Sequence, residues 1–295
     1  MEALCGSETL DETTIEWNTW PVRQNLWGTY TGSIYSNFSP LIHNYTNRRL
    51  SYQADALNAV AGVLHHHSQA DDPVYNIIGL PYHVGIQDIS LHSIDTIMGP
   101  ALSWSHSDFG PQPERRHVFP TWTWAGWTDC VEWEPSPGEI TASCLKNVEF
   151  ENSTGKLFGS PELNSCKSGP DLQQMLDSVQ VVVFEAPTIP SWLIKSPREH
   201  EGSGHSIMIA GHGVDGWDLA TANADDLVAN VEQGVWTCFC LTKAESRIFI
   251  LVVRWVDEHT AERITGFSLW KHQRTEEEVQ RFEDCLGEMR SVRLI

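Results

Sequence analysis

The sequence predicts an α+β protein in which a helical N-terminal part precedes a mostly antiparallel, β-rich C-terminal part. Two observations lead to this prediction. Before residue 130 the apolar residues recur at helical spacing, most clearly over 57–64. After residue 131 they alternate with polar residues or form short β-branched runs, as over 179–184 and 248–256. The chain has 295 residues, 41 % of them hydrophobic, which is enough for one large domain or two modest ones.

Shifts in composition divide the chain into three expected parts. Residues 1–14 are acidic and polar, so we expect a flexible tail. Residues 15–130 form the helical part, which is rich in tryptophan. Residues 131–295 form the β-rich part, which includes a helix near 276–288. The boundary between the last two parts follows from the change of apolar period near residue 130.

Within the helical part, the clearest expected element is a helix over 52–64 with Ser51 as its N-cap. Gly62 lies on the apolar stripe of this helix, which indicates close packing against another element or an early helix end. A second helix is expected to end at Gly99-Pro100, because proline removes a backbone donor. Between the two helices, residues 75–80 are expected to form a short buried strand or turn.

Within the β-rich part, the clearest hairpin pairs 248–256 with 261–269. Its first strand is apolar on both faces, so we expect it at the centre of a sheet. A capping-box pattern over 275–278 begins the helix near 276–288. Further strands are expected at 131–133, 148–150, 156–158, 179–184, 206–209, 236–241 and 292–295, and a short helix is expected at 171–178.

The net charge restricts the possible partners. With 39 acidic and 19 basic residues the formal net charge is −20, which repels phosphate backbones and anionic lipid. We therefore expect neither nucleic-acid nor membrane binding, since the arginine pairs at 48–49 and 115–116 are isolated. The first 20 residues lack the pattern of a secretory signal, and the 7 cysteines are odd in number. We accordingly expect a cytoplasmic protein with reduced thiols.

The most distinctive stretch is 119–133, which holds four of the 13 tryptophans. Trp122 and Trp124 alternate, so an extended backbone would project both to one face. Trp127 follows nearby, and each indole offers a large apolar area and one N–H donor. The stretch is either a structural joint where two subdomains meet, which we favour, or an aromatic platform on which Trp122, Trp124 and Trp127 bind a ligand or partner.

The sequence contains no phosphate loop, dinucleotide fingerprint, nucleophile elbow or zinc-protease motif. We expect no cofactor and no metal, because the consecutive histidines 65–67 would point about 100° apart on a helix. The glycine-rich stretch 211–217 could carry acid–base chemistry through His212 and Asp215, although turns between strands have the same composition. Asp55, near the arginine pair at 48–49, is more typical of helix capping and ion pairing.

Whether the chain is an enzyme is left open by these motifs. If it is one, the first catalytic candidates are His117, Asp129 and Glu132. These side chains flank the tryptophan stretch, and each could transfer a proton at a pocket that indoles line.

Three segments resemble fungal heterokaryon-incompatibility (HET) domain proteins. Residues 45–62, YTNRRLSYQADALNAVAG, are similar to the stretch R-x-L-[ST]-x-x-x-D-x-L-x-A-x-x-G that lies downstream of the HET domain in those proteins. Residues 119–127, FPTWTWAGW, are similar to their signature F-P-S-W-S-W-A-G-W, with Thr121 and Thr123 in place of serines. Residues 261–270, after the strand 248–256, are similar to their closing β segment. Order and spacing agree over about residues 40–295.

The HET domain itself, with its S-Y-x-W-G opening and D-x-x-C-I-N-Q segment, has no counterpart in these residues. That domain resembles TIR-type folds, which in related systems cleave NAD or signal cell death, so no catalytic residue carries over. The resemblance therefore implies a non-catalytic interaction or regulatory module in fungal non-self recognition and programmed cell death. Its partner would be a protein or a small apolar molecule. The alternative is a cofactor-free cyclase, isomerase or hydrolase of a fungal secondary-metabolite pathway.

Overall fold

The computed structural model describes residues 35–48, 50–71, 73–83, 93–106, 113–133, 140–195, 205–209, 212–215, 224–244, 247–270 and 276–295. All of them belong to one unit, Ser33–Ile295. The tail expected over 1–14 lies outside the described residues.

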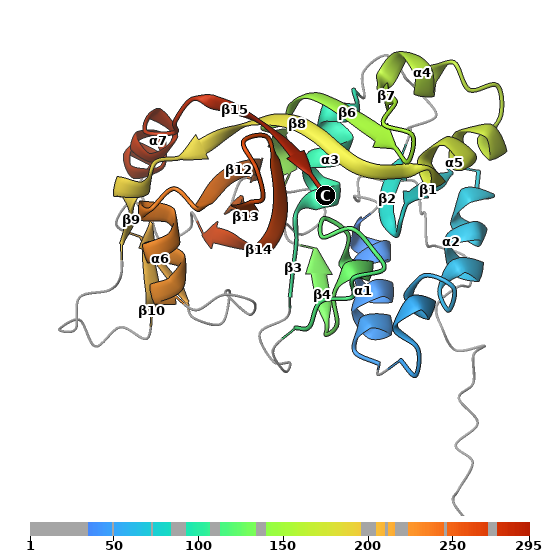
Figure 1. Ribbon diagram of the computed structural model, residues 1–295, viewed down its shortest axis with the longest axis horizontal. Helices are drawn as coiled ribbons and strands as arrows, with labels where there is room; N and C mark the ends of the chain where they lie inside the picture. The colour runs from blue at the N-terminus through green and yellow to red at the C-terminus, as the bar shows by residue number, and fades with distance from the viewer. Residues whose placement is uncertain are drawn as a thin grey trace, which may run out of the picture. The chain divides into compact units, whose positions relative to one another are not determined.

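The described residues form mixed α+β structure with one large, mostly antiparallel sheet (Figure 1), as the sequence predicts. The first part is not purely helical, because two small two-stranded sheets accompany its helices. In chain order its elements are α1 (Tyr35–Thr46), the 3₁₀ helix η2 (Gln53–Ala56), α2 (Ala61–Ser68), β1 (Val74–Ile77), β2 (Leu80–His83), α3 (Ile94–Leu102), β3 (Trp104–His106), the 3₁₀ helix η3 (Trp124–Gly126) and β4 (Val131–Trp133).

The prediction of a helix over 52–64 is wrong in its bounds. The chain forms one 3₁₀ turn, η2, and α2 begins only at Ala61. Ser51 does not act as the N-cap, because Tyr52 precedes η2 and no side chain caps that end. The Tyr45 hydroxyl donates a hydrogen bond of 2.7 Å to the Ala56 carbonyl. This tertiary contact holds η2 against α1 and overrides the local helical preference.

Gly62 and Gly99 differ from their expected roles. Gly62 is exposed on α2, and a Cβ there would meet no atom of the described residues within 4 Å, so the predicted close packing is wrong for this part of the chain. The helix that was expected to stop at Gly99-Pro100 continues to Leu102. A Cβ on Gly99 would lie 2.3 Å from Ser143 Oγ. Glycine at this position therefore allows α3 to approach β5 (Ile140–Ser143) closely.

The segment predicted as a short strand or turn is a tight hairpin of β1 and β2. The two turn residues, Ile78 and Gly79, have φ angles of 46° and 89°. Positive φ at both positions is the conformation of a type I′ turn, whose twist matches that of the flanking strands. A Cβ on Gly79 would lie 2.9 Å from the Trp124 ring, so this turn packs directly on the tryptophan stretch.

Five long strands close into a ring. They are β8 (Val179–Ile189), β12 (Trp236–Ala244), β13 (Arg247–Trp255), β14 (Thr260–Trp270) and β15 (Met289–Leu294). They pair in the order β12-β13-β14-β15-β8, and β8 pairs back to β12 through Thr188 and Ile189. The β14–β15 pairing is parallel and the other four are antiparallel. β5 lies beside β12, while β6 (Lys146–Asn152) and β7 (Leu157–Phe158) continue the sheet beside β8.

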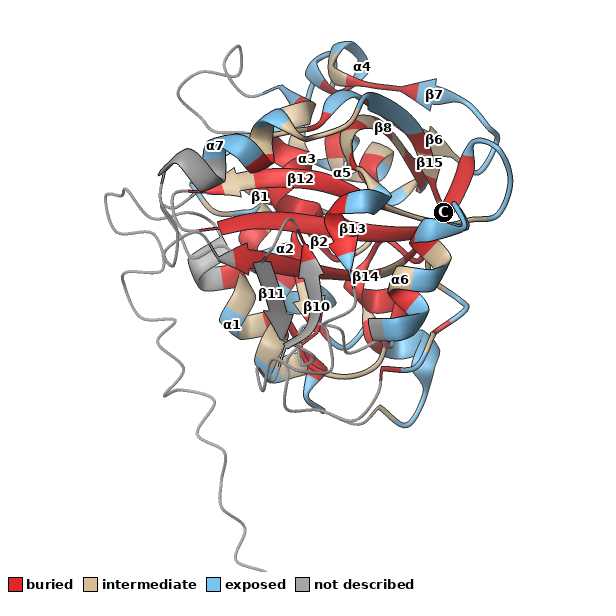
Figure 2. Cartoon of the chain, turned by 90° about the vertical axis from the view of Figure 1, so that its left-hand side faces the viewer, coloured by how far each residue is buried: buried red, intermediate tan, exposed pale blue. Residues whose placement is uncertain are grey.

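The hairpin predicted across 257–260 is confirmed, and its first strand is central. β13 pairs with β12 on one side and with β14 on the other. It is buried continuously from Arg247 to Val253 (Figure 2). One of its faces packs in a cluster with α6 (Ala224–Glu232) and with Phe282 of α7 (Glu276–Asp284). The apolar run of β13 therefore reflects a strand that is covered on both faces.

The other predicted strands coincide with or overlap β4, β6, β7, β8, β12, β15 and β10 (His205–Ile209), although β7 begins one residue later and β15 ends one residue earlier than predicted. The short helix predicted over 171–178 is α5 (Gly169–Asp177). α7 ends at Asp284, earlier than predicted, and Thr275 of the capping-box pattern lies outside the described residues. His212 and Asp215, which were expected in a loop, are the first and last residues of strand β11 (His212–Asp215), which pairs with β10.

Three short elements complete the described fold. They are α4 (Ser160–Asn164), η4 (Ser191–Leu193) and β9 (Ile194–Lys195). Among the helices described here, none is long and apolar enough to cross a membrane.

Candidate functional site

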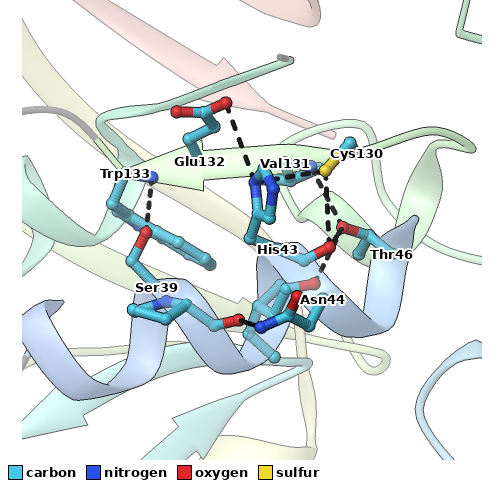
Figure 3. Close-up of polar contacts among 10 residues, drawn as sticks. Ser39, His43, Asn44, Thr46, Cys130, Val131, Glu132 and Trp133 are labelled. Carbon is cyan, nitrogen blue, oxygen red and sulfur yellow. Dashed lines mark hydrogen bonds and ion pairs between the residues drawn. The ribbon is translucent and has the colours of Figure 1, made fainter. Parts of the chain in front are cut away.

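β4 lies along α1, and two hydroxyl groups of the helix hold it there (Figure 3). Thr46 Oγ1 accepts a hydrogen bond of 3.0 Å from the Val131 amide. Ser39 Oγ accepts one of 3.1 Å from the Trp133 amide. Ser39 and Thr46 are seven residues apart and therefore share one helix face, on which His43 lies between them. This docking brings the chain around β4 next to the imidazole of His43.

Cys130 and Glu132 both approach one nitrogen of His43. Cys130 Sγ lies 3.1 Å from His43 Nδ1, and Glu132 Oε1 lies 3.7 Å from the same atom (Figure 3). The thiol also donates to the His43 carbonyl at 3.4 Å. Because both groups use Nδ1, the arrangement differs from a catalytic triad, in which the acid and the nucleophile bind opposite ring nitrogens.

The Cys130 thiol is buried, with 5 % of the residue exposed. Burial raises the pKa of this thiol to about 11, and the negative charges of Glu132 and Asp129 act in the same direction. At neutral pH the thiol is therefore protonated and donates hydrogen bonds, whereas a nucleophilic cysteine needs the thiolate. The side chains of His43 and Glu132 are 38 and 39 % exposed, so these two groups can exchange protons with solvent.

Asp129 is held in an unfavourable backbone conformation next to Cys130. Its φ of 74° lies in the left-handed region, which costs free energy for a residue other than glycine. Its Oδ2 atom is buried and has no hydrogen-bond partner among the described residues. Burial raises the pKa of the carboxyl group, and a backbone hydrogen bond from Cys130 offsets part of that effect. Strain and an unsatisfied carboxylate oxygen at one residue are typical of a functional turn.

Two of the three acid–base candidates therefore lie together. Asp129 and Glu132 flank Cys130, while His117 is exposed in the turn after Arg116. Within the described part of the chain, His117 makes no hydrogen bond or ion pair with either acid. Sequence reasoning missed His43, which lies 87 residues from Cys130. Since no motif connects the two positions, only the docking of α1 on β4 could have revealed the pair.

The other polar candidates form no shared site. His65 and His66 are exposed on the last turn of α2, while His67 is buried. Asp55 accepts a hydrogen bond of 3.4 Å from Asn58 Nδ2, which is a local contact at the surface. Among the described residues, no group of three or more His, Cys, Asp or Glu side chains is arranged to hold a metal ion.

Trp122, Trp124 and Trp127 are buried, with exposed fractions of 0, 0 and 8 %. Every one of their indole N–H groups donates to a backbone carbonyl, at 3.3 Å to Gln180, 2.8 Å to Gly79 and 2.8 Å to Thr121 respectively. Trp104 and Trp133 do the same, to Trp122 and Ala101. With area and donors both used inside the protein, these indoles fit the structural interpretation better than a ligand platform.

Trp122 and Trp124 do not share one face. Trp124 begins η3, so the backbone is not extended through the stretch. The Trp122 indole reaches Gln180 of β8, and the Trp124 indole reaches the β1–β2 turn. The two side chains thus join different elements to one loop. The prediction that their alternation places them on one face is wrong.

His106 is a second titratable group inside the protein. It is 6 % exposed and lies edge-on to the rings of Trp104 and Trp127, and in the described part of the chain its Nδ1 atom has no hydrogen-bond partner. Burial lowers the pKa of His106 to about 3, and the charge of Arg263 contributes in the same direction. The imidazole is therefore neutral at physiological pH, and its burial couples folding to pH below neutrality.

An open groove lies where β8 ends and where β12 and β15 begin, beside α6. Its cavity volume is about 380 Å³, and Ile189, Val231, Trp236, Glu288 and Arg290 are among the residues that line it. The guanidinium of Arg290 stacks 3.9 Å from the ring centre of Trp255. The lining of the groove is thus more polar than apolar, and it holds charged groups of both signs beside a few apolar side chains.

Comparison of the chain with protein-family models, with curated proteins and with solved structures finds no match.

Truncating Trp122 or Trp124 tests the structural interpretation. Trp122→Ala or Trp124→Ala should destabilise the fold by roughly 3–5 kcal/mol, because each removes a fully buried ring and its hydrogen bond. That is a large share of the roughly 5–15 kcal/mol of a typical domain, so we expect a strongly lowered melting temperature or insoluble protein. Trp192→Ala is the matched control, since Trp192 is 62 % exposed. Two stable, soluble variants at 122 and 124 would show that the indoles are not structural.

His106 should make the fold sensitive to acid. The folded pKa of about 3 is below the ordinary value of 6.5, so the unfolded chain binds the extra proton between these two pH values. Stability from this group is present above pH 6.5 and is lost as the pH falls towards 3, at up to about 1.4 kcal/mol per pH unit. His106→Phe should flatten the dependence of urea midpoints on pH in this window, and His65→Gln should not. An unchanged slope in His106→Phe would contradict the assignment.

Proposed function

We propose that this chain is a non-catalytic interaction or regulatory module, similar to the C-terminal region of fungal HET-domain proteins, that acts in cytoplasmic non-self recognition. The observation that carries the proposal is the direct contact among the three segments on which the resemblance rests. A sequence signature whose residues pack the fold indicates a shared fold, and it does not indicate a shared catalytic activity.

The three segments that carry the resemblance contact one another. Tyr45 of the first segment lies edge-on to Trp124 of the second, with ring centres 6.0 Å apart. Arg116 Nε, just before the second segment, donates to Gln53 Oε1 of the first at 2.5 Å. The Arg263 amide of the third segment donates to Thr121 Oγ1 of the second at 3.0 Å. These contacts give the combination of motifs a structural reason that needs no substrate.

The groove supplies the surface on which such a module would bind. Of the large apolar side chains that are exposed in the described residues, Trp192 and Val235 directly follow groove residues, and Met289 lines it. Val256 is close by, because the Trp255 amide donates to the Val235 carbonyl. The chain carries a formal net charge of −20, so a basic protein with an apolar anchor is the complementary partner.

The binding test compares exposed apolar residues at the groove with exposed ones elsewhere. Trp192→Ser and Met289→Ser should each weaken binding of a purified partner, captured from a fungal extract, by about 10-fold or more, because aromatic and Met anchors dominate interfaces. Val118→Ser is the matched control, since Val118 is 63 % exposed. Isothermal titration at two salt concentrations measures both affinity and charge complementarity. Equal affinity of groove and control variants, or turnover of NAD by the purified chain, would overturn the proposal.

A second candidate function is a cofactor-free enzyme, which the Cys130–His43–Glu132 contact supports. The polar groups lie together beside a strained Asp129, and two of them reach solvent. The protonated Cys130 thiol favours proton transfer by His43 and Glu132 over covalent catalysis in this alternative.

Metabolite profiles decide between the two functions. If the chain is an enzyme, gene disruption removes a metabolite, Glu132→Gln fails to restore it, and Glu185→Gln, at an exposed hydrogen-bonded carboxylate of β8, restores it fully. Restoration by Glu132→Gln with normal protein level would exclude Glu132 from catalysis, and an unchanged profile after disruption would exclude the enzymatic function.

A further inference from the structure

The cysteines of β12 and of the segment after β5 form a second chemically competent cluster, away from Cys130. Cys144 Sγ lies 3.6 Å from Cys240 Sγ. The two positions are 96 residues apart in sequence, and the Cys144 amide donates a hydrogen bond of 2.8 Å to the Leu241 carbonyl. We propose that Cys144 and Cys240 form a reversible disulfide in the folded protein when a peroxide oxidises the two thiols.

Backbone contacts next to the two cysteines hold their sulfur atoms close together. β5 pairs with β12 through Ser143 and Thr242. Ser143 directly precedes Cys144, and Thr242 lies two residues after Cys240. The sulfur atoms need to approach by about 1.5 Å to reach bonding distance, which side-chain rotation can supply.

The two thiols differ in solvent accessibility, and this difference determines which of them reacts first with the peroxide. Cys144 is partly exposed, while Cys240 is fully buried. The thiolate of Cys144 attacks hydrogen peroxide, which leaves a sulfenic acid and one hydroxide ion. Cys240 sulfur then attacks the Cys144 sulfur and expels a second hydroxide. With both thiol protons counted, two thiols and one peroxide give one disulfide and two waters.

Opposing effects act on the Cys240 thiol, because the contact with Cys144 and burial raise its pKa while the Lys243 charge lowers it. The Lys243 ammonium lies near both sulfur atoms and forms an ion pair of 2.9 Å with Glu283 of α7. The hydrogen bond with Cys144 has the largest effect, followed by burial, and both raise the pKa of the Cys240 thiol well above its ordinary value. Cys240 is thus a resolving thiol and not the first target, and the rate of oxidation should rise with pH as the thiolate fraction grows.

The disulfide would fasten the edge of the sheet to its centre. β5 is the last strand beside β12, and α3 rests on it through Ser143 Oγ, which donates to the Asp95 carbonyl at 2.5 Å. On the other side of the pair, Ser103 Oγ of the residue after α3 contacts Thr242 Oγ1 at 3.1 Å. Oxidation therefore locks α3 and β5 onto the five-strand ring, whichever function the protein serves.

The experiment treats the purified full chain with hydrogen peroxide, blocks free thiols with iodoacetamide and maps the peptides by mass spectrometry. We expect a linked pair that contains Cys144 and Cys240, an intact mass lower by two hydrogens, and reversal by dithiothreitol. The melting temperature should rise by roughly 5–10 °C on oxidation, because the bond closes a loop of nearly 100 residues.

Single variants separate this bond from adventitious oxidation. Cys144→Ser should abolish both the linked peptide and the rise in melting temperature, and Cys240→Ala serves if the serine variant at 144 does not fold. Cys166→Ser, at a partly exposed position after α4, should change neither. A dominant link through Cys285 or Cys238, or sulfonic acid at Cys144 with Cys240 still alkylated, would overturn the proposal.

Discussion

Backbone carbonyls of the irregular segment 113–127 require donors, and the half-buried Arg115, the buried Arg116 and buried tryptophans supply them. Arg115 Nη1 donates to the carbonyls of Arg116 and Gly126 at 2.5 and 2.6 Å, and its Nη2 donates to that of Phe119. Arg116 Nη1 donates to the carbonyls of Ala125 and Trp127. A loop with few ladder partners of its own can be buried only if every carbonyl finds such a donor. This constraint explains why cationic side chains lie inside a protein of strongly negative net charge.

Arg263 extends the same arrangement to the ring of strands. It is 1 % exposed, its guanidinium donates to the carbonyls of Leu102 and Trp104, and it stacks 3.5 Å from the ring centre of Trp104. Within the described residues no carboxylate pairs with it, and burial lowers the pKa of its guanidinium. A buried cation that only dipoles and one aromatic face stabilise fixes geometry more than it adds stability. It thereby sets where α3 and β3 lie against β14.

The sequence predicted the elements that depend on local residue patterns, and it did not predict the closure of the five strands into a ring. The β13–β14 hairpin was predictable because an apolar run, a polar turn and a second alternating run lie next to each other in the chain. The closure of the ring was not, because the β8–β12 pairing involves only Thr188 and Ile189. The helix over 52–64 failed for the opposite reason: its apolar spacing is real, but the contact of Tyr45 with Ala56 holds a 3₁₀ turn there.

The candidate site shows the same division at the level of single residues. Asp129 and Glu132 could be selected because they adjoin a conspicuous aromatic stretch. His43 could not, because it reaches Cys130 only after Ser39 and Thr46 dock α1 on β4. Cys144 and Cys240 also lack any motif, since a thiol pair across strands has no fixed spacing. These reactive groups meet only through long-range packing, so a sequence pattern does not predict which of them lie together.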